Sequence, residues 1–113
     1  MQEEIVVRRQ NRIKLRGYIA DIFDGTAEHD AIVVDVSFEG LCLTELSNRF
    51  VVGKKSYDAV VSGGPDADLL KLQVKLRWVR RHGTFLEAGF VIIRPPTKWK
   101  KFIRTRLPKE ELL

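Results

Sequence analysis

The chain has 113 residues, 44% of them hydrophobic, and a formal charge of +5 from 20 basic and 15 acidic residues. This length suits one domain with a modest core, and the hydrophobic content excludes an intrinsically disordered chain. The positive charge favours an anionic partner, such as a nucleotide, nucleic acid, an acidic protein face or a membrane surface, and is also compatible with a basic protein that has no such partner.

A single cysteine, Cys42, excludes an intrachain disulfide and favours a reducing, cytoplasmic setting. The N-terminus begins with acidic residues and lacks the apolar core of a secretory signal. No apolar stretch approaches the ~20 residues that span a bilayer. We therefore expect a soluble protein.

The first twelve residues are polar, end in an arginine cluster and lack a strand or helix pattern, so residues 1–12 are predicted to form a flexible tail before a domain over residues 13–113. A strand is predicted from Ile13 to about Phe23. Its alternation places Ile13, Leu15, Gly17, Ile19 and Phe23 on one face. The stretch Asp24-Gly25-Thr26 has the composition of a turn.

Next come two strands that form a hairpin, over residues 30–36 and from Leu41 onward, connected by a tight turn. A fourth strand is predicted over residues 56–61. The clearest pattern follows, because Leu70, Leu72, Val74, Leu76 and Trp78 alternate with mostly polar residues. After the turn at His82-Gly83-Thr84, a last strand is predicted over residues 85–93.

The period changes after Pro95-Pro96. A short amphipathic helix is predicted over about residues 97–107, with an apolar stripe of Trp99, Phe102, Ile103 and Leu107. Six short strands with hairpin spacing predict an all-β fold, a six-stranded antiparallel barrel whose mouth or side is covered by a short C-terminal α-helix. Closure of the barrel would remove exposed strand edges.

Two short motifs stand out. Arg8 and Arg12 are spaced as RxxxR, and Asp35, Ser37 and Gly40 form DxSxxG in the predicted hairpin turn. Each motif has an ordinary structural interpretation: a solvated basic tail for the first, and for the second a turn in which Asp and Ser bind backbone amides and Gly adopts a positive φ.

In this order, and in a chain of this size, the two motifs resemble those of the PilZ family. That family carries RxxxR just before the first barrel strand and D/NxSxxG after the second. The segment Gly40-Leu41-Cys42-Leu43 and the late hairpin with Trp78 and Gly89-Phe90 are also similar, so the resemblance covers roughly residues 8–107. It implies a six-stranded PilZ-type β-barrel with a short C-terminal α-helix.

The resemblance also implies binding of the bacterial second messenger cyclic di-GMP. Arg8 and Arg12, joined by Arg9, are expected at phosphates and guanine Hoogsteen edges, where a guanidinium donates paired hydrogen bonds. Asp35 would accept hydrogen bonds from the guanine N1–H and amino group and so select guanine over adenine. Ser37 would offer a hydroxyl, and Gly40 would allow close approach of the ligand. We expect the tail to be mobile without ligand and to wrap over it on binding.

Two further features each allow two interpretations. Trp78 is expected on the apolar face of its strand, where core packing is its first role and ligand contact a second one. The basic face of the C-terminal helix is either simply solvated or a docking surface for a partner protein.

We expect no enzymatic activity, no cofactor other than the ligand and no metal site, because no catalytic or zinc-binding spacing is present. The leading hypothesis is a cyclic di-GMP receptor that acts as an adaptor for an unidentified effector protein. One alternative is a PilZ-like interaction module without ligand binding. The other is a small basic barrel that binds nucleic acid, which would need exposed aromatic side chains interleaved with basic ones.

Overall fold

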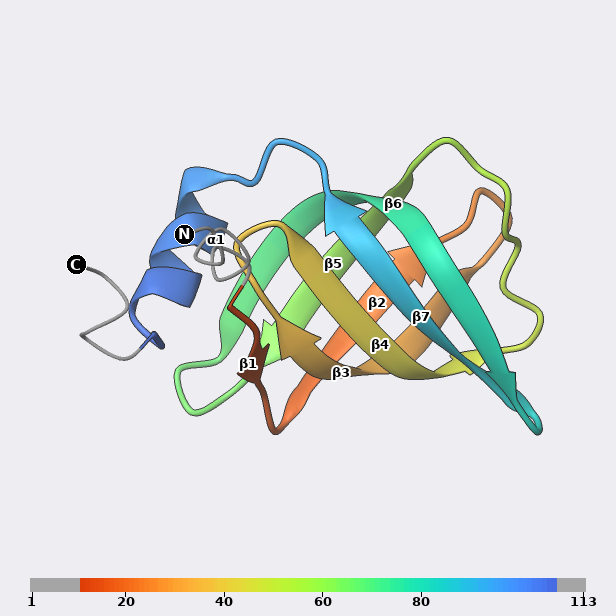
Figure 1. Ribbon diagram of the computed structural model, residues 1–113, viewed down its shortest axis with the longest axis horizontal. Coiled ribbons are helices and arrows are strands. Elements are labelled where there is room, and N and C mark those ends of the chain that lie inside the picture. Colours follow the sequence, from red (N-terminus) through yellow and green to blue (C-terminus); the bar gives the residue numbers. More distant parts are fainter. Residues whose placement is uncertain (1–10, 108–113) are drawn as a thin grey trace, which may run out of the picture.

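A computed structural model describes residues 11–107. Its elements are β1 (Ile13–Lys14), β2 (Tyr18–Phe23), β3 (Glu28–Val36), β4 (Gly40–Ser47), β5 (Tyr57–Gly63), β6 (Asp68–His82), β7 (Phe85–Ile92) and α1 (Thr97–Arg104). Six of the strands form a closed antiparallel ring in the order β3-β2-β5-β6-β7-β4, because β4 pairs back onto β3 (Figure 1). Each strand of the ring is therefore paired on both sides. The predicted six-stranded barrel is confirmed.

The first predicted strand is divided in two. β1 pairs with the end of β3, on the same side of β3 as β2. Residues 15–17 separate β1 from β2 and interrupt this pairing with β3. Gly17 has a φ of +76°, a conformation that residues with a side chain rarely adopt. The interruption shifts the alternation of side chains by one residue.

This shift makes the prediction of one shared face wrong, because Ile13 and Leu15 pack against the core while later members of the set do not. Tyr18, Ala20 and Ile22 point into the core, whereas Ile19 and Phe23 are 45% and 43% exposed. Because side chains of a strand alternate with a period of two, a single out-of-register step moves every later side chain to the opposite face.

β6 keeps the predicted alternation over its first half, where Leu70, Leu72 and Val74 are buried. Its pairing with β7 then shifts between Leu76 and Trp78. Such a bulge re-aims the side chains that follow it. Trp78 is consequently 40% exposed, so the expectation that it packs in the core is wrong. From this point to its last residue β6 is exposed on both faces.

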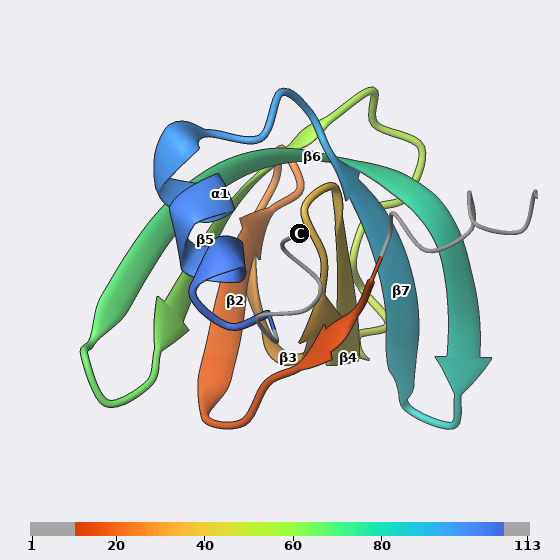
Figure 2. The same cartoon turned by 60° about the vertical axis from the view of Figure 1, so that its left-hand side comes forward.

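α1 closes one end of the barrel, which we call the helix end (Figure 2). Trp99, Phe102 and Ile103 are buried and belong to the same core cluster as the barrel side chains. The predicted stripe is confirmed for these three residues, and Leu107 is partly buried against the core. The helix ends at Arg104, three residues before the predicted end, because the amides of Arg106 and Leu107 bind carbonyls three residues earlier in a tighter turn.

Arg106 connects the segment after α1 to the barrel by hydrogen bonds. Its Nη2 donates to the Tyr18 hydroxyl at 2.9 Å, and the Tyr18 hydroxyl donates to Asp68 at 2.7 Å. The Arg106 guanidinium also lies 3.9 Å from the centre of the Phe102 ring. These contacts join α1, β2 and β6 at the helix end.

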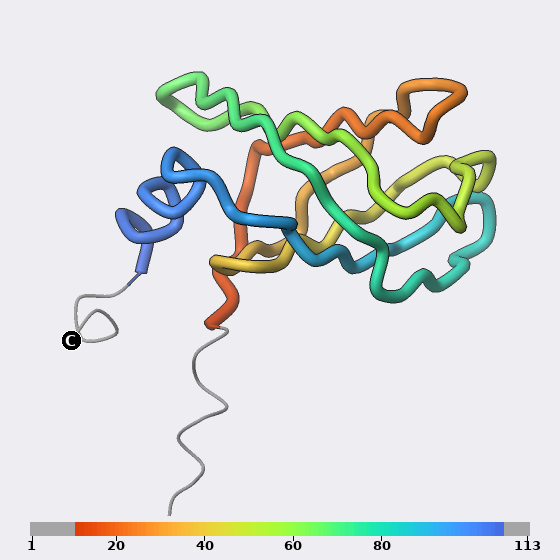
Figure 3. Tube along the Cα trace, turned by 90° about the horizontal axis from the view of Figure 1, so that it is seen from above, coloured from red at the N-terminus to blue at the C-terminus, as the bar shows by residue number. Residues whose placement is uncertain are grey.

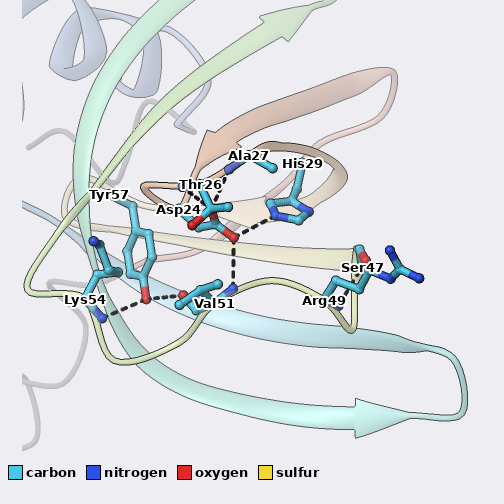
Figure 4. A network of polar contacts seen from close by, with 9 residues as sticks. All are labelled: Asp24, Thr26, Ala27, His29, Ser47, Arg49, Val51, Lys54 and Tyr57. Carbon is cyan, nitrogen blue, oxygen red and sulfur yellow. Dashed lines mark hydrogen bonds and ion pairs between the residues drawn. The ribbon is translucent and has the colours of Figure 1, made fainter.

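The opposite end, which we call the loop end, carries the β2–β3 turn, the β4–β5 loop and the β6–β7 turn (Figure 3). Asp24, 1% exposed, organises it (Figure 4). One carboxylate oxygen accepts from the amides of Thr26 and Ala27, each at 2.8 Å, and the other contacts His29 at 2.8 Å and the Val51 amide at 3.0 Å. The Ala27 amide, followed by those of Val51 and Thr26, lowers the pKa of Asp24 well below its ordinary value, although burial opposes this.

Within residues 11–107, no helix is long and apolar enough to cross a membrane.

Candidate functional site

The turn between β3 and β4 carries the second motif. Asp35 lies one residue before the end of β3, between Lys14 of β1 and Cys42 of β4. The β3–β4 pairing shifts at this point, as in a β-bulge. The Ser37 amide donates to the Gly40 carbonyl at 2.9 Å and closes the turn. The predicted hairpin is confirmed, and its polar residues lie at the helix end.

Arg12 reaches this turn because β1 pairs with the last residues of β3. Its Nε donates to Asp35 Oδ1 at 2.6 Å, and the two side chains are 44% and 21% exposed. Both charges thus remain partly in contact with water. Arg12 of the first motif therefore lies beside Asp35 of the second. Only Nε of the Arg12 guanidinium is bonded to Asp35 Oδ1, and its two Nη groups are not.

Gly40 is closely surrounded by its neighbours. It is the first residue of β4 and does not have a positive φ, in contrast to the ordinary turn interpretation. A Cβ at this position would lie 3.1 Å from Ser37 Oγ, 3.2 Å from Arg12 Nη1 and 3.5 Å from the Phe90 carbonyl. A side chain here would therefore press on the arginine and on the turn.

Ser37, whose amide closes the turn, is fully buried, with 0% exposure. Its carbonyl and that of Phe38 both accept from Trp99 Nε1, each at 3.1 Å. The guanidinium of Arg104 lies 5.8 Å from the centre of the Phe38 ring. The motif turn therefore contacts α1 on one side while Asp35 and Gly40 face the other.

On that other side lies a cleft with a volume of about 560 Å³. It is lined by residues of the motif turn, β4, β6 and β7: Arg12, Asp35, Glu39, Gly40, Cys42, Arg77, Trp78, Gly89, Phe90 and Val91. The cleft thus places the Arg12–Asp35 pair and Trp78 on the walls of one space.

Trp78 lies against the backbone of Gly89, its partner on β7. A Cβ on Gly89 would come within 2.2 Å of the indole nitrogen, so only glycine leaves room for the indole in this position. The Arg80 guanidinium lies 5.3 Å from the centre of the indole ring. The bulge in β6 therefore converts a predicted core tryptophan into an exposed aromatic surface with arginine beside it.

Cys42 also lines the cleft but is suited to packing rather than to chemistry. Burial, together with the negative charges of Asp35 and Glu87, raises the pKa of its thiol to about 11. The thiol is therefore protonated at neutral pH and is a poor nucleophile. In the described part of the chain there is also no group of three or more histidine, cysteine, aspartate or glutamate side chains that could hold a metal ion.

Four of the predicted site residues thus lie at one cleft: Arg12, Asp35, Gly40 and Trp78. Ser37 is buried in the motif turn and does not line the cleft, and Arg8 and Arg9 fall outside the described residues. Sequence reasoning missed Arg77, Arg80 and Gly89. A glycine within a strand marks a close approach by another group, and this signal was present at Gly89.

A closed six-stranded antiparallel barrel with a short helix at one end has the PilZ-type fold. Solved structures with a similar fold include the following two. The inhibitor of motility MotI/DgrA of Bacillus subtilis matches 99% of this chain with a TM-score of 0.71 and 9% identity. The PlzA protein of Borreliella burgdorferi, in complex with cyclic di-GMP, matches 96% with a TM-score of 0.57 and 14% identity. At these identities the likeness concerns the fold.

The chain spans 53% of the length of the first of these proteins and 38% of the second. No protein-family model matches the sequence, and no curated protein is significantly similar to it.

Proposed function

We propose that this chain is a non-enzymatic receptor for cyclic di-GMP, which binds in the cleft between the motif turn and the Trp78 surface. The observation that carries the proposal is the placement of Arg12 and Asp35, 2.6 Å apart, on the wall of a cleft that also contains Trp78. Each is matched to one part of the ligand: a cation to phosphate, a carboxylate to the donor edge of guanine, and an aromatic plane to the face of a base.

Arg12 is assigned to a phosphate or to the Hoogsteen edge of a guanine. Its Nε is held by Asp35, which orients the guanidinium plane, and the Nη groups are directed elsewhere. A planar fork of this kind donates two parallel hydrogen bonds, worth ~1–3 kcal/mol of discrimination at guanine O6 and N7. Arg8 and Arg9, which lie outside the described residues, are assigned to the same ligand from the sequence motif alone.

Asp35 has two tasks in this proposal. It positions Arg12, and its second carboxylate oxygen accepts from the guanine N1–H and amino group, an arrangement that adenine does not offer. Ser37, being buried, is assigned first to holding the turn in shape, and the direct hydroxyl contact expected from the sequence stays a prediction. Gly40 allows Arg12 to lie close over the turn.

Trp78 is assigned to stacking. Stacking of a base on an aromatic side chain is worth ~1–3 kcal/mol, and every base offers a face for it. The indole is exposed, held against Gly89 and flanked by Arg77 and Arg80. Stacking supplies affinity, while the Arg12–Asp35 pair supplies selection of guanine.

Transfer of the signal to an effector protein is proposed through α1. Trp99 donates to two carbonyls of the motif turn and is itself part of the helix that closes the barrel. A ligand that shifts the turn therefore acts directly on the position of the indole and of α1. The outer face of α1 carries Lys100, Lys101 and Arg104, which would suit an acidic surface on an effector.

Isothermal titration calorimetry with cyclic di-GMP, cyclic di-AMP and a single-stranded oligonucleotide tests the proposal. We expect micromolar or tighter binding of cyclic di-GMP only. Arg12→Ala and Asp35→Ala should each weaken it by tenfold or more, since each leaves a polar ligand group without its partner. Arg16→Ala is a matched control, because Arg16 is exposed and does not line the cleft. Wild-type affinity in both site variants would refute the assignment.

A second candidate function has an observation in its favour. The exposed half of β6 combines Trp78 with Arg77, Arg80 and Arg81, which is the interleaving of aromatic and basic side chains that single-stranded nucleic acid binding requires. Binding of the oligonucleotide in the same titration, falling steeply with salt and unaffected by Asp35→Ala, would favour this function instead.

A further inference from the structure

The outer surface of β2 and β3 has a composition unlike the rest of this basic chain. The outward side chains pair across the two strands as Ile19 with Ile32, Asp21 with Asp30 and Phe23 with Glu28. We call these six residues the acidic-apolar face. On the ring of strands β2 lies three steps from β7 in either direction, so this face is on the opposite side of the barrel from the cleft.

Large apolar side chains border the face at both ends. Ile19, Ile32 and Phe23 are 45%, 42% and 43% exposed, although each could have been polar without any cost to the core. Single exposed apolar residues are common on protein surfaces, but adjacent ones rimmed by charge are typical of interaction sites. Here they flank a row of carboxylates.

The charge of the face is uniformly negative. Asp21 and Asp30 are directly opposite each other, Glu28 is next along β3, and Asp58 of β5 pairs with Phe23. Within residues 11–107 none of these four carboxylates forms an ion pair. A side-chain hydrogen bond with Asp30, together with burial and the charges of Asp30 and Glu28, raises the pKa of Asp21. Like charges directly opposite on neighbouring strands destabilise a sheet, so the arrangement has a cost in the isolated chain.

Strand addition cannot cover this face, because β2 is paired with β3 and β5, and β3 is paired with β2 and β4. A partner must therefore dock with side chains onto the flat of the barrel. Ile19 and Phe23 are four residues apart on β2, a separation of ~13 Å at a strand rise of ~3.3 Å per residue. In an α-helix with a rise of ~1.5 Å per residue, side chains eight residues apart are separated by ~12 Å along the axis, which is close to this distance.

We propose that the acidic-apolar face is a docking surface for an amphipathic helix of a partner protein, with apolar side chains at positions i and i+8 and a lysine or arginine at i+4. The apolar side chains contact Ile19 and Ile32 at one end and Phe23 at the other. The basic side chain lies between Asp21 and Asp30 and relieves their repulsion. Binding of this helix does not depend on cyclic di-GMP and is separate from the proposed nucleotide site.

A designed peptide tests this surface. The probe is a 16-residue helix-forming peptide with leucine at i and i+8 and lysine at i+4, titrated into the ¹⁵N-labelled full chain without nucleotide. We expect amide shift changes over residues 19–23 and 28–32 and a saturable titration. Replacing the lysine by glutamate, or both leucines by alanine, should weaken binding by tenfold or more.

Variants of the chain complete the test. Asp21→Asn combined with Asp30→Asn should weaken binding at least fivefold and flatten its dependence on salt, whereas Asp66→Asn, an exposed carboxylate in the β5–β6 turn, should not. The proposal is overturned if one millimolar peptide causes no shifts on β2 and β3, if the shifts lie in the cleft, or if the double variant binds like the wild type. Self-association of the chain through this face without peptide would also overturn it, in favour of a second copy as occupant.

Discussion

At the scale of single residues, the candidate site depends on two glycines that are needed for space. Gly40 leaves room for Arg12, and Gly89 leaves room for the indole of Trp78. Neither has a positive φ, so backbone conformation alone would tolerate alanine at both positions. Their effect is to let side chains that belong to different strands approach the same cleft.

Gly89→Ala should displace Trp78 from the cleft wall, since the added Cβ would come within 2.2 Å of the indole nitrogen. The exposed indole can rotate away, so we expect little change in melting temperature and a roughly tenfold loss of cyclic di-GMP affinity, equivalent to one lost stacking contact of ~1–3 kcal/mol. Titration calorimetry and thermal unfolding measure the two effects.

The control for Gly89→Ala is the double variant with Trp78→Ala. If the glycine acts through the indole, the double variant and Trp78→Ala alone should bind equally. Additive losses would mean that Gly89 acts through something other than Trp78.

At the residue scale the resemblance to the PilZ family implied that Arg12, Asp35 and Gly40 lie together, and all three line one cleft, while their role in ligand binding stays a prediction. The exposure of Trp78 was not predictable. Alternation assigned it to the core, and the bulge that turns it outward arises from the pairing of β6 with β7, which involves residues of both strands.

At the scale of elements, α1 is connected to the motif turn by a few specific contacts. Trp99 has 0% exposure and donates to the carbonyls of Ser37 and Phe38, while Arg106 fastens the following residues to Tyr18. The helix therefore closes the barrel core and supports the cleft at the same time. We therefore expect a change in the position of α1 to alter the motif turn at the cleft, and the reverse.

Trp99→Phe should loosen the motif turn, since it removes the indole N–H and leaves the carbonyls of Ser37 (buried) and Phe38 (partly buried) without that donor. We expect a loss of about 2–3 kcal/mol in the free energy of unfolding. Hydrogen exchange should become selectively faster at the Ser37 amide, which bonds to Gly40, and at the Ile92 amide, which bonds to Glu39.

Phe102→Leu is the matched control for Trp99→Phe. Phe102 stacks on Trp99 with ring centres 5.5 Å apart but has no hydrogen bond to the turn. It should lower stability by ~1–2 kcal/mol through lost packing. Equal acceleration of the Ser37 and Ile92 amides in both variants would show that the turn responds to general destabilisation and not to the indole.

The elements themselves were predicted with uneven success. β6, β7 and α1 follow strong periodic patterns, and their existence and order are confirmed. The interruption between β1 and β2 was missed, because Ile13, Leu15, Ile19 and Phe23 fit one continuous alternation. Gly17 marks the break, yet a lone glycine at an alternating position does not by itself indicate a change of register.

At the scale of the whole molecule, the two ends of the barrel are held in different ways. The helix end is closed by apolar side chains of α1, and the loop end by the polar contacts of Asp24. A buried carboxylate with four partners was not recognisable in the sequence, where Asp24-Gly25-Thr26 indicates only a turn. The Val51 amide and His29, which complete its contacts, come from other elements.

Stability in acid should depend on Asp24. Its pKa is low in the folded chain and ~4 when unfolded, so the folded state binds fewer protons below pH 4. Its contribution is therefore complete above about pH 4 and is lost as the pH falls from there toward the folded pKa. Asp24→Asn should lower the free energy of unfolding by about 2–3 kcal/mol at pH 7. The free energy of unfolding of this variant should also depend less on pH between 4 and 2 than that of the wild type.

Urea unfolding at several pH values measures this dependence. Asp66→Asn, at an exposed turn position, should leave both the stability and its pH profile unchanged. A parallel loss of stability in acid for the wild type and Asp24→Asn would assign the acid sensitivity to other carboxylates.

The chain has two tryptophans in different surroundings: Trp78 is partly exposed to water at the cleft, and Trp99 is fully buried in the core next to the motif turn. Their fluorescence should accordingly have a red-shifted component from the first and a blue-shifted one from the second. Quenching of the red component alone would report occupancy of the cleft, and a change in the blue one would report movement of α1. Without any label, the molecule thus carries an optical reporter for each of these events.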